Sequence, residues 1–529
     1  MQDILQAITD RRRADIAALG CTLGASVPEQ RTRPAPVPFI AQKGVVLEIK
    51  RASPSKGDIA PHLDAAQTAR HYAAAGAAAI SVLTERHWFK GSLDDLQAAA
   101  RAADEYARQN GTPRVAILRK DFLLTPDEID VAYRAGADAV LLIARMLSAD
   151  ELTAMAQACA QRGMTAFIEV RHADDLQKLA AAAQKVPPAH IVCGVNARDL
   201  QDFSIDLLTP ARMLAHIKAI LGPDARCIFE SGIRTPQAAR FAGSLGFTGM
   251  LLGEAAARNP ADARALVTAF VDAPPTQNAA QWREFAEQPR GKPSVKICGL
   301  TNLADARKSA ALGADFLGFI FWADSPRRAD EATVRHISSE IRAQARQSGT
   351  SAPKLVGVIV DADSDDGKTV RRLVREGVLD FIQLHGCADS FFATPDTDLA
   401  HYAVVNVSDE TDLAHIDALR LRGEPRILID AKAGLLPGGT GKRIADALVE
   451  KVARKTRLWL AGGITPENVR SVCDTFRPEL IDVASGTESA PGKKDAAKLE
   501  KLFAELKKQP VFGRKDLIFW RTRPIITID

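Results

Sequence analysis

The sequence predicts an α/β fold made of two tandem (β/α)8 TIM barrels. The first observation is that short apolar, β-rich runs alternate with alanine-rich helical segments, as in parallel sheets built from right-handed crossovers. The second is that eight such runs occupy the first half of the 529 residues and eight more the second, and eight strands in about 250 residues indicate a closed barrel. The third is a glycine-rich turn that recurs at the matching place in both halves.

The first barrel is predicted over residues 1–271. It opens with an amphipathic helix over residues 1–20, in which Arg11 to Arg13 are interpreted as a solvated face. Its expected strands are 45–50, 79–84, 115–120, 139–143, 166–170, 191–196, 227–230 and 249–253.

The second barrel is predicted over residues 294–508. Residues 272–293 are polar and rich in turn-forming residues, which indicates a linker. The expected strands are 295–298, 316–321, 355–360, 381–385, 403–407, 427–430, 458–461 and 481–484, with a closing helix near 495–507. The tail, residues 509–529, is left unassigned.

The composition argues against a nucleic-acid-binding, a disulfide-bonded or a membrane-spanning protein. The chain has 69 Lys and Arg against 65 Asp and Glu, and a net charge of +4 gives no indication of nucleic-acid binding. The seven cysteines include no C-x-x-C pair, which argues against a disulfide framework and fits a reducing compartment. The start lacks a signal-peptide core, and no apolar run reaches about 18 residues. We therefore expect a cytoplasmic protein without a membrane span. We also expect a monomer, although these observations do not bear on the oligomeric state.

The recurring turn is predicted to bind phosphate. It reads Glu-Ser-Gly-Ile-Arg-Thr-Pro at 230–236 and Ala-Gly-Gly-Ile-Thr-Pro at 461–466, and Thr-Pro starts a helix well. A second apolar run with a glycine near its end follows each copy, at 250–254 and 483–487. Loops after strands seven and eight of a barrel commonly form a phosphate site. One such turn alone is an ordinary βα connection, but the pair, repeated in both halves, favours phosphate.

The expected strands of the first half end in charged and polar residues. Alternation along a strand puts Glu48 and Lys50 on one face, here the barrel interior. Later strand ends supply Lys120, Glu169, Asn196, Arg198, Glu230, Ser231 and Gly232. Any one of them can be a solvated loop residue. Gathered at one barrel mouth, they would perturb each other's pKa values, as acid–base catalysis requires.

These residues resemble indole-3-glycerol-phosphate synthase over about residues 1–270. The motifs include Glu-Ile-Lys-Arg-Ala-Ser-Pro-Ser at 48–55, Leu-Arg-Lys-Asp-Phe at 118–122 and Gly-Val-Asn-Ala-Arg-Asp-Leu at 194–200. The resemblance implies that carboxyphenylamino-deoxyribulose 5-phosphate closes to indole-3-glycerol phosphate with loss of CO2 and water.

The same resemblance implies residue roles. Lys120 would be the general acid and Glu169 the general base, supported by Glu48, while Lys50 would face the substrate carboxylate. The substrate would be held by Asn196, Arg198 and Phe122, and its phosphate by Ser53, Ser231, Gly232, Gly253 and Glu254. Some relatives carry serine at position 254, and a carboxylate there must point away from phosphate.

The first strand of the second half ends in Cys298. Alone, it would be a buried structural cysteine, the usual fate of a free cysteine. The residues after it predict a turn and a helix cap, and a helix terminus can lower the pKa of a thiol. Asp430 ends the sixth strand and can act as its acid partner, and Arg327 can clamp a carboxylate. Cys298, His385 and Asp430 lack the spacing of metal ligands.

These residues resemble phosphoribosylanthranilate isomerase over about residues 294–508, with Lys-Ile-Cys-Gly-Leu-Thr at 296–301 and Asp-Val-Ala-Ser-Gly-Thr-Glu at 482–488. The resemblance implies an Amadori rearrangement of N-(5-phosphoribosyl)anthranilate. Asp430 would protonate the ring oxygen, the thiolate of Cys298 would take the C2 proton, and Arg327 would hold the carboxylate. The remaining substrate-binding residues are Gln383, His385, Gly462, Gly463, Ser485 and Gly486. The family usually has aromatic residues after Gly-Gly-Thr-Gly at 438–441, and residues 443–446 depart from this pattern.

The product of the second barrel would be the substrate of the first. The sequence therefore predicts a bifunctional enzyme of tryptophan biosynthesis with small phosphorylated substrates and no metal or organic cofactor. A histidine-pathway isomerase is the nearest enzyme alternative, but it would need paired aspartates at strands one and five. A barrel protein that only binds phosphosugars, with one or both activities lost, is the alternative from another class. Free diffusion of the intermediate is expected.

Overall fold

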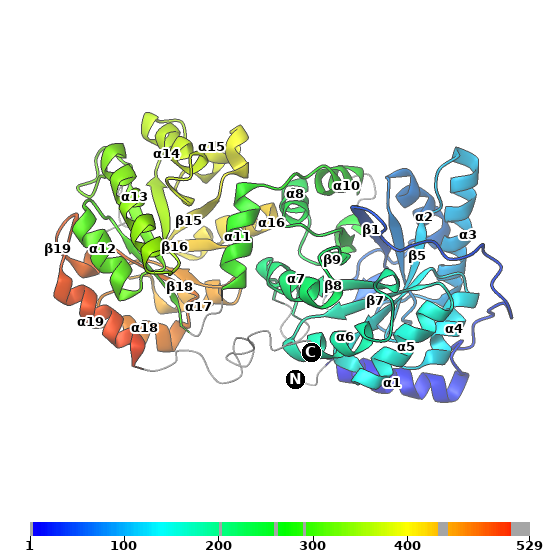
Figure 1. Ribbon diagram of the computed structural model, residues 1–529. Helices are drawn as coiled ribbons and strands as arrows, with labels where there is room; N and C mark the ends of the chain where they lie inside the picture. The colour runs from blue at the N-terminus through cyan, green and yellow to red at the C-terminus, as the bar shows by residue number, and fades with distance from the viewer. Residues whose placement is uncertain are drawn as a thin grey trace. The chain divides into compact units, whose positions relative to one another are not determined.

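The computed structural model describes residues 4–54, 56–199, 204–258, 263–288, 292–431 and 443–508. The chain divides into two compact units, the first over residues 1–275 and the second over most of the chain from Thr276 onward (Figure 1). The unassigned tail 509–529 and the 438–441 motif lie outside the described residues. Within those residues no helix is both long and apolar enough to cross a membrane.

The first unit is a closed barrel of eight parallel strands, ordered β1-β10-β9-β8-β7-β6-β5-β4. The strands are β1 (Gly44–Ile49), β4 (Ala79–Leu83), β5 (Ala116–Lys120), β6 (Ala139–Ile143), β7 (Thr165–Val170), β8 (Ile191–Asn196), β9 (Cys227–Glu230) and β10 (Gly249–Leu252). Two further short strands, β2 (Ala52–Ser53) and β3 (Gly57–Asp58), pair as a hairpin after β1.

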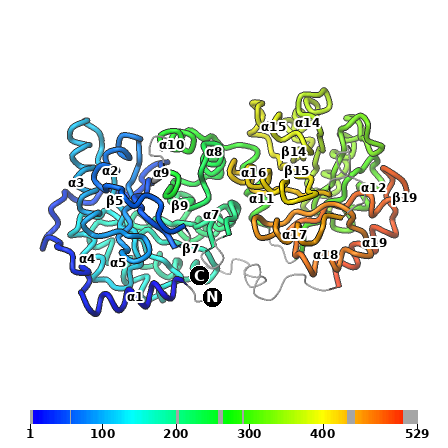
Figure 2. Tube along the Cα trace, turned by 180° about the vertical axis from the view of Figure 1, so that it is seen from behind, coloured from blue at the N-terminus to red at the C-terminus, as the bar shows by residue number. Residues whose placement is uncertain are grey.

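Helices ring this barrel, as the tube in Figure 2 also shows. They are α1 (Ile4–Leu19), α2 (Ala65–Ala74), α3 (Leu93–Asn110), α4 (Pro126–Arg134), α5 (Ala149–Gln161), α6 (Ala173–Ala183), α7 (Leu208–Leu221), α8 (Pro236–Ser244), α9 (Glu254–Arg258) and α10 (Ala263–Val271). The Thr-Pro signal acts as predicted in α8, where the Thr235 side chain accepts a hydrogen bond from the Ala238 N–H and Pro236 occupies the first turn.

The interior face of the barrel strands is apolar in the middle of the barrel and becomes polar at their carboxyl ends. Val46 and Leu118 belong to a cluster of buried apolar residues inside the first barrel. Two residues further along the same strands stand Glu48 and Lys120, on the same face because the side-chain period of a strand is two. The packed interior therefore supports the polar residues from below.

The second unit is also a closed parallel barrel, ordered β11-β12-β13-β14-β15-β16-β17-β18, so the predicted fold of two (β/α)8 barrels is confirmed. Its barrel strands are β11 (Ser294–Cys298), β12 (Phe316–Ile320), β13 (Lys354–Ile359), β14 (Phe381–His385), β15 (His401–Val407), β16 (Ile427–Ala431), β17 (Trp459–Leu460) and β18 (Leu480–Val483). A hairpin of β19 (Glu488–Ala490) and β20 (Lys493–Lys494) follows β18.

The helices of the second unit alternate with these strands. They are α11 (Gln277–Glu287), α12 (Leu303–Leu312), α13 (Glu331–Gln347), α14 (Asp365–Arg375), α15 (Ala388–Phe392), α16 (Leu413–Arg422), α17 (Asp446–Ala453), α18 (Val469–Phe476) and α19 (Ala496–Lys507). The expected closing helix near 495–507 is thus present as α19.

Helix α11 lies inside the segment expected to be a linker. Its Trp282 is fully buried, with ring centroids 5.3 Å from Phe381 and 5.6 Å from Trp459. Phe285, one turn later, lies 5.3 Å from Trp459 and 6.1 Å from Phe316. These partners are the first residues of β12, β14 and β17, so α11 covers the amino-terminal end of the second barrel.

One expectation for α1 is wrong. Arg12 was expected on a solvated face, but it is 5% exposed. Its Nη2 lies 2.6 Å from the Glu128 carboxylate and 3.2 Å from Asp121. A buried arginine needs such partners. The pattern of α1 alone did not reveal that these partners, from β5–α4, would reach it.

Candidate active sites

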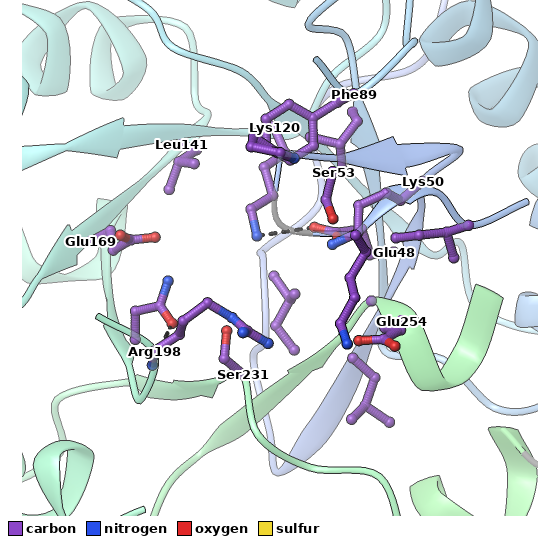
Figure 3. Close-up of a pocket in the computed structure, with 18 of the residues that line it drawn as sticks. Glu48, Lys50, Ser53, Phe89, Lys120, Leu141, Glu169, Arg198, Ser231 and Glu254 are labelled. Atoms are coloured by element: carbon purple, nitrogen blue, oxygen red, sulfur yellow. Dashed lines mark hydrogen bonds and ion pairs between the residues drawn. The ribbon is translucent and has the colours of Figure 1, made fainter. Parts of the chain in front are cut away.

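The first candidate site is a cavity at the carboxyl ends of the strands of the first barrel, drawn in Figure 3. The structure brings together every residue predicted for this site: Glu48, Lys50, Ser53, Lys120, Phe122, Glu169, Asn196, Arg198, Ser231, Gly232, Gly253 and Glu254 all line it. They come from β1 and the hairpin after it, β5, β7, β8 and the loops after β9 and β10.

Lys120 lies at the centre of the charged cluster. Its Nζ is 2.9 Å from Glu48 Oε2 and 3.4 Å from Glu230 Oε2. Burial disfavours the ammonium, but the carboxylates of Glu48, Glu230 and Glu169 outweigh it and raise the pKa of Lys120. Lys120 is therefore protonated and can serve as a proton donor.

Glu48 is held as a carboxylate. Burial favours its neutral form, yet Lys120 and Lys50 hold its pKa at about 2. Lys50 Nζ donates to Glu48 Oε1 over 2.8 Å. Glu48 thus holds both ammonium groups at the barrel mouth, and Figure 3 draws its contact with Lys120 as a dashed line.

Two further buried carboxyl groups, those of Glu169 and Glu230, lie near Lys120. Burial raises the pKa of Glu169, against the pull of Lys120 and a hydrogen bond with Asn196. Burial and the neighbouring Glu169 also raise the pKa of Glu230. A carboxylate whose pKa is raised toward neutrality is a better proton acceptor, which suits Glu169 as a base.

The turn after β9 has the backbone geometry expected of an anion-binding turn. Ser231 and Gly232 both have positive φ, 70° and 85°, and a left-handed serine is a strained conformation often found at functional sites. Consecutive turn N–H groups form concave anion sites. Next to this turn, Arg234 Nη2 lies 3.1 Å from Glu254 Oε2. The Glu254 carboxylate is thus paired with a guanidinium inside the predicted phosphate site.

Sequence reasoning missed one charged residue beside this cavity and several residues that line it. Glu230 stood at a strand end, but no role was predicted for it. Phe89 lies 5.9 Å from Phe122, ring to ring, and α1 contributes Ile4, Leu5 and Ile8 to the lining. The amphipathic pattern of α1 predicted only that its apolar face is buried, and nothing in it indicated a cavity.

The second candidate site is a cavity at the carboxyl ends of the strands of the second barrel. It too brings together all its predicted residues: Cys298, Arg327, Gln383, His385, Asp430, Gly462, Gly463, Ser485 and Gly486. Gly462 and Gly463 have positive φ, 92° and 62°, as a glycine-specific turn requires.

The pKa of the Cys298 thiol in this second site is shifted in the direction opposite to the expected one. A helix terminus was expected to lower the pKa of the Cys298 thiol, but burial raises it, against the pull of Lys296. The thiol is 6% exposed, and the cap of the next helix, Asn302, comes four residues later, so it provides no nearby helix start. Burial also raises the pKa of Asp430 to about 6 and lowers that of His385 to about 4.

Arg327 is oriented by a residue that sequence reasoning did not select. Its Nε lies 3.0 Å from each carboxylate oxygen of Glu488, and its Nη2 lies 2.9 Å from Oε2. Lys494 Nζ also reaches Glu488, at 3.2 Å. Both partners lie in the β19–β20 hairpin, whose short strands gave no periodic signal.

The loop that departs from the isomerase pattern is partly described. Ile444 is buried in the main apolar cluster of the second barrel. Arg443 and Asp446 form an exposed ion pair of 3.1 Å. Residues 438–442 lie outside the described part of the chain. Within that part, no three His, Cys, Asp or Glu side chains group as a metal site would need.

Comparison with known proteins identifies a family for each of the two barrels. Residues 6–269 match the indole-3-glycerol phosphate synthase family, and residues 295–505 match the N-(5'-phosphoribosyl)anthranilate isomerase family. The tryptophan biosynthesis protein TrpCF of Vibrio parahaemolyticus is 31% identical over 87% of this chain and 83% of its own length.

Two longer fungal proteins are also similar. The multifunctional tryptophan biosynthesis protein of Schizosaccharomyces pombe is 31% identical over 94% of this chain, and that of Phycomyces blakesleeanus is 31% identical over 86%. The chain spans 65% and 61% of these two relatives. The chain belongs to the family of tandem indole-3-glycerol phosphate synthase and phosphoribosylanthranilate isomerase barrels.

Proposed function

We propose that the chain is a bifunctional enzyme of tryptophan biosynthesis. The second barrel would isomerise N-(5-phosphoribosyl)anthranilate to 1-(2-carboxyphenylamino)-1-deoxyribulose 5-phosphate, and the first would close that product to indole-3-glycerol phosphate. Residues 1–271 and 294–508 would be the catalytic barrels. The observation that carries the proposal is Lys120, which lies between Glu48 and Glu230 in one cavity with Glu169 and the turn after β9.

In the second barrel, the groups needed for an Amadori rearrangement line one cavity. Asp430, with a pKa of about 6, holds a proton for part of the time near neutral pH and gives it to the ribose ring oxygen as the C1–O bond breaks. The thiolate of Cys298 takes the C2 proton of the resulting iminium, and the enolamine then tautomerises to the ketone. Arg327 keeps the N–H groups of Nη1 for the anthranilate carboxylate, since Glu488 engages Nε and Nη2.

In the first barrel, ring closure needs an acid at the ketone oxygen. The Lys120 ammonium gives its proton to that oxygen while the aromatic carbon attacks the carbonyl carbon. Loss of CO2 returns the bonding electrons to the ring. The hydroxyl then leaves as water, with a proton from a regenerated acid, while Glu169 takes the proton that must depart for the indole double bond to form.

A coupled assay tests both assignments. Purified protein receives phosphoribosylanthranilate, whose fluorescence loss is followed, and indole-3-glycerol phosphate is quantified. We expect Cys298→Ala to leave the substrate unconsumed and Lys120→Met to accumulate the open-chain intermediate. Cys473→Ala in α18 and Lys43→Met before β1 are matched controls far from the two mouths, and they should retain both activities.

The contrary outcomes separate the two barrels. If the substrate persists while added intermediate is converted, the isomerase assignment fails, and the 443–446 loop is the first place to look. If folded protein converts neither compound but still binds phosphate, a phosphosugar-binding role replaces the enzymatic one.

The proposal also covers the location of the protein and its oligomeric state. The free thiols of all seven cysteines support a reducing, cytoplasmic location. We also propose a monomer, because both main sheets close into barrels and so offer no open strand edge to a second copy. Sedimentation equilibrium at the mass of two chains would contradict it.

A further inference from the structure

An ammonium group lies buried beneath the cavity of the second barrel. Lys296 is 0% exposed and stands two residues before Cys298 on β11, so both side chains share one face of the strand. The intervening Ile297 belongs to the apolar cluster between strands and helices, which places Lys296 and Cys298 on the interior face.

The partners of Lys296 account for two of its three N–H groups. Its Nζ donates to Asp482 Oδ2 over 2.5 Å and to Gln383 Oε1 over 2.8 Å. The same Gln383 oxygen accepts from the Tyr402 hydroxyl over 2.8 Å. Asp482 lines the cavity, and its Oδ1 is buried with no hydrogen-bond partner. The ammonium is thus fixed by one charged and one neutral acceptor.

Gly318 shows how closely the thiol and the ammonium approach one another. A Cβ at this position of β12 would lie 2.8 Å from Cys298 Sγ and 3.1 Å from Lys296 Nζ. The two side chains therefore border the same small space, which glycine leaves open. A charge this close to a thiol acts on its ionisation with little screening, because water is excluded.

Other charged groups also face the thiol. Lys494, from β20, donates to the Cys298 carbonyl oxygen over 2.7 Å, to the Ala484 carbonyl oxygen over 2.9 Å and to Glu488 over 3.2 Å. Its three N–H groups are therefore occupied by these oxygens. Asp482 from β18 favours the neutral thiol, and Tyr402 from β15 lies close enough for the thiolate to raise the pKa of its hydroxyl. Lys296 is the cation with an N–H group left to turn toward sulfur.

We propose that Lys296 is a positioning residue that acts as the counter-ion of the Cys298 thiolate. Asp482 competes with the thiolate for the same ammonium and so limits how strongly Lys296 stabilises the thiolate. When the thiol releases its proton, the new negative charge draws Lys296 from Asp482. The inference rests on the proposed isomerase for the use of the thiolate, but the thiolate itself can be measured without substrate.

The test is the pH dependence of Cys298 alkylation by iodoacetamide in the full chain, read from the labelled peptide by mass spectrometry. In Lys296→Met we expect the pKa of Cys298 to rise by about 1 unit or more, because an opposite charge nearby accounts for about 1–3 units. In Asp482→Asn we expect the pKa of Cys298 to fall, because no other carboxylate then competes with the thiolate for the charge of the Lys296 ammonium. The double variant should lie between the two.

The controls separate the counter-ion role from a structural role, because only the counter-ion role shifts the pKa of Cys298 in opposite directions in the two variants. Cys21, a half-buried cysteine of the first barrel, is labelled in the same sample and should keep its profile. A purely structural role would shift both variants in the same direction or in neither, and either result overturns the proposal. If Lys296→Met does not fold, Asp482→Asn decides alone, and an unchanged or raised pKa rejects the counter-ion role. If wild type lacks isomerase activity while the opposite shifts occur, the function fails and this inference stands.

Discussion

At the scale of single residues, Asp430 illustrates a conflict between function and stability. Its carboxyl group is buried, so its pKa is about 6 instead of 3.8. A raised pKa in the folded state means that stability is fully present below the unfolded pKa and is lost as pH rises through about 6. Folded protein near neutral pH therefore carries a buried carboxylate at a cost, and it tolerates this cost because the group must release and regain a proton.

We predict that Asp430→Asn abolishes isomerase activity but stabilises the second barrel above pH 7. The increase in the free energy of unfolding over wild type should be about 2 kcal/mol larger at pH 8 than at pH 4.5. The upper bound on this difference is set by the roughly 2 units between the folded and unfolded pKa values of Asp430. Calorimetry at the two pH values measures it. Asp474→Asn, an exposed change in α18, is the control and should show no such pH dependence. An equal effect of Asp430→Asn at both pH values would contradict the prediction.

Glu254 is the second informative residue, because it places a carboxylate in a site proposed for phosphate. Its pairing with Arg234 neutralises it in part, and both lie near Arg198, whose pKa is lowered by burial and by Arg234. Glu254→Ser should strengthen binding of inorganic phosphate by about tenfold, or 1.4 kcal/mol.

Titration calorimetry of the full chain measures this binding. Glu105→Ser, which breaks an exposed pair with Arg70, is the matched control and should leave it unchanged. Unchanged or weaker phosphate binding by Glu254→Ser would show that the carboxylate already points away from the phosphate.

At the scale of elements, α11 is the part that strand and helix patterns misplaced. Its sequence is polar on average and lies between proline-containing segments, so a linker was the natural expectation. Yet Trp282 and Phe285 fall on one face at helical spacing and cover the ends of three strands. The two aromatic residues were the available signal, but their partners are far away in the sequence.

We predict that Trp282→Ala destabilises the second barrel alone. Truncating a fully buried tryptophan costs about 3–5 kcal/mol, so isomerase activity should be lost at a lower temperature while indole synthesis keeps its own midpoint. Thermal inactivation followed with both assays checks this. Arg283→Ala, on the exposed side of the same helix, is the control. Equal loss of both activities would mean that the two units unfold together.

At the scale of the whole molecule, the two sites are each built within one barrel. We therefore expect the intermediate to leave the second barrel and reach the first through solution. The coupled reaction should show a lag set by the synthase acting on free intermediate, and added intermediate should dilute a labelled pool completely. Stopped-flow measurement of the lag, with Lys120→Met as the blocked control, tests this. A missing lag would indicate direct transfer.

The sequence predicted the barrels and their mouths well, for a physical reason. A strand has a period of two, so the residue pattern alone places Glu48 and Lys50 on an interior face, and it places Lys120 at the end of another strand. The sequence did not predict two features that depend on contacts between distant segments. One is the burial of Arg12 against Asp121 and Glu128, and the other is the hydrogen bonding of Arg327 to Glu488. The pKa of Cys298 was mispredicted for the same reason, since burial depends on the whole barrel and not on the next helix.

The position of α11 also determines where this chain can be divided. A cut made before β11, where the strand pattern starts, would leave Phe316, Phe381 and Trp459 without their cover at one end of the barrel. Such an apolar patch promotes association between molecules. A cut before Thr276 keeps the helix with its barrel. For anyone transplanting the isomerase half into another protein, the transferable module therefore begins with the helix that the composition presents as a spacer.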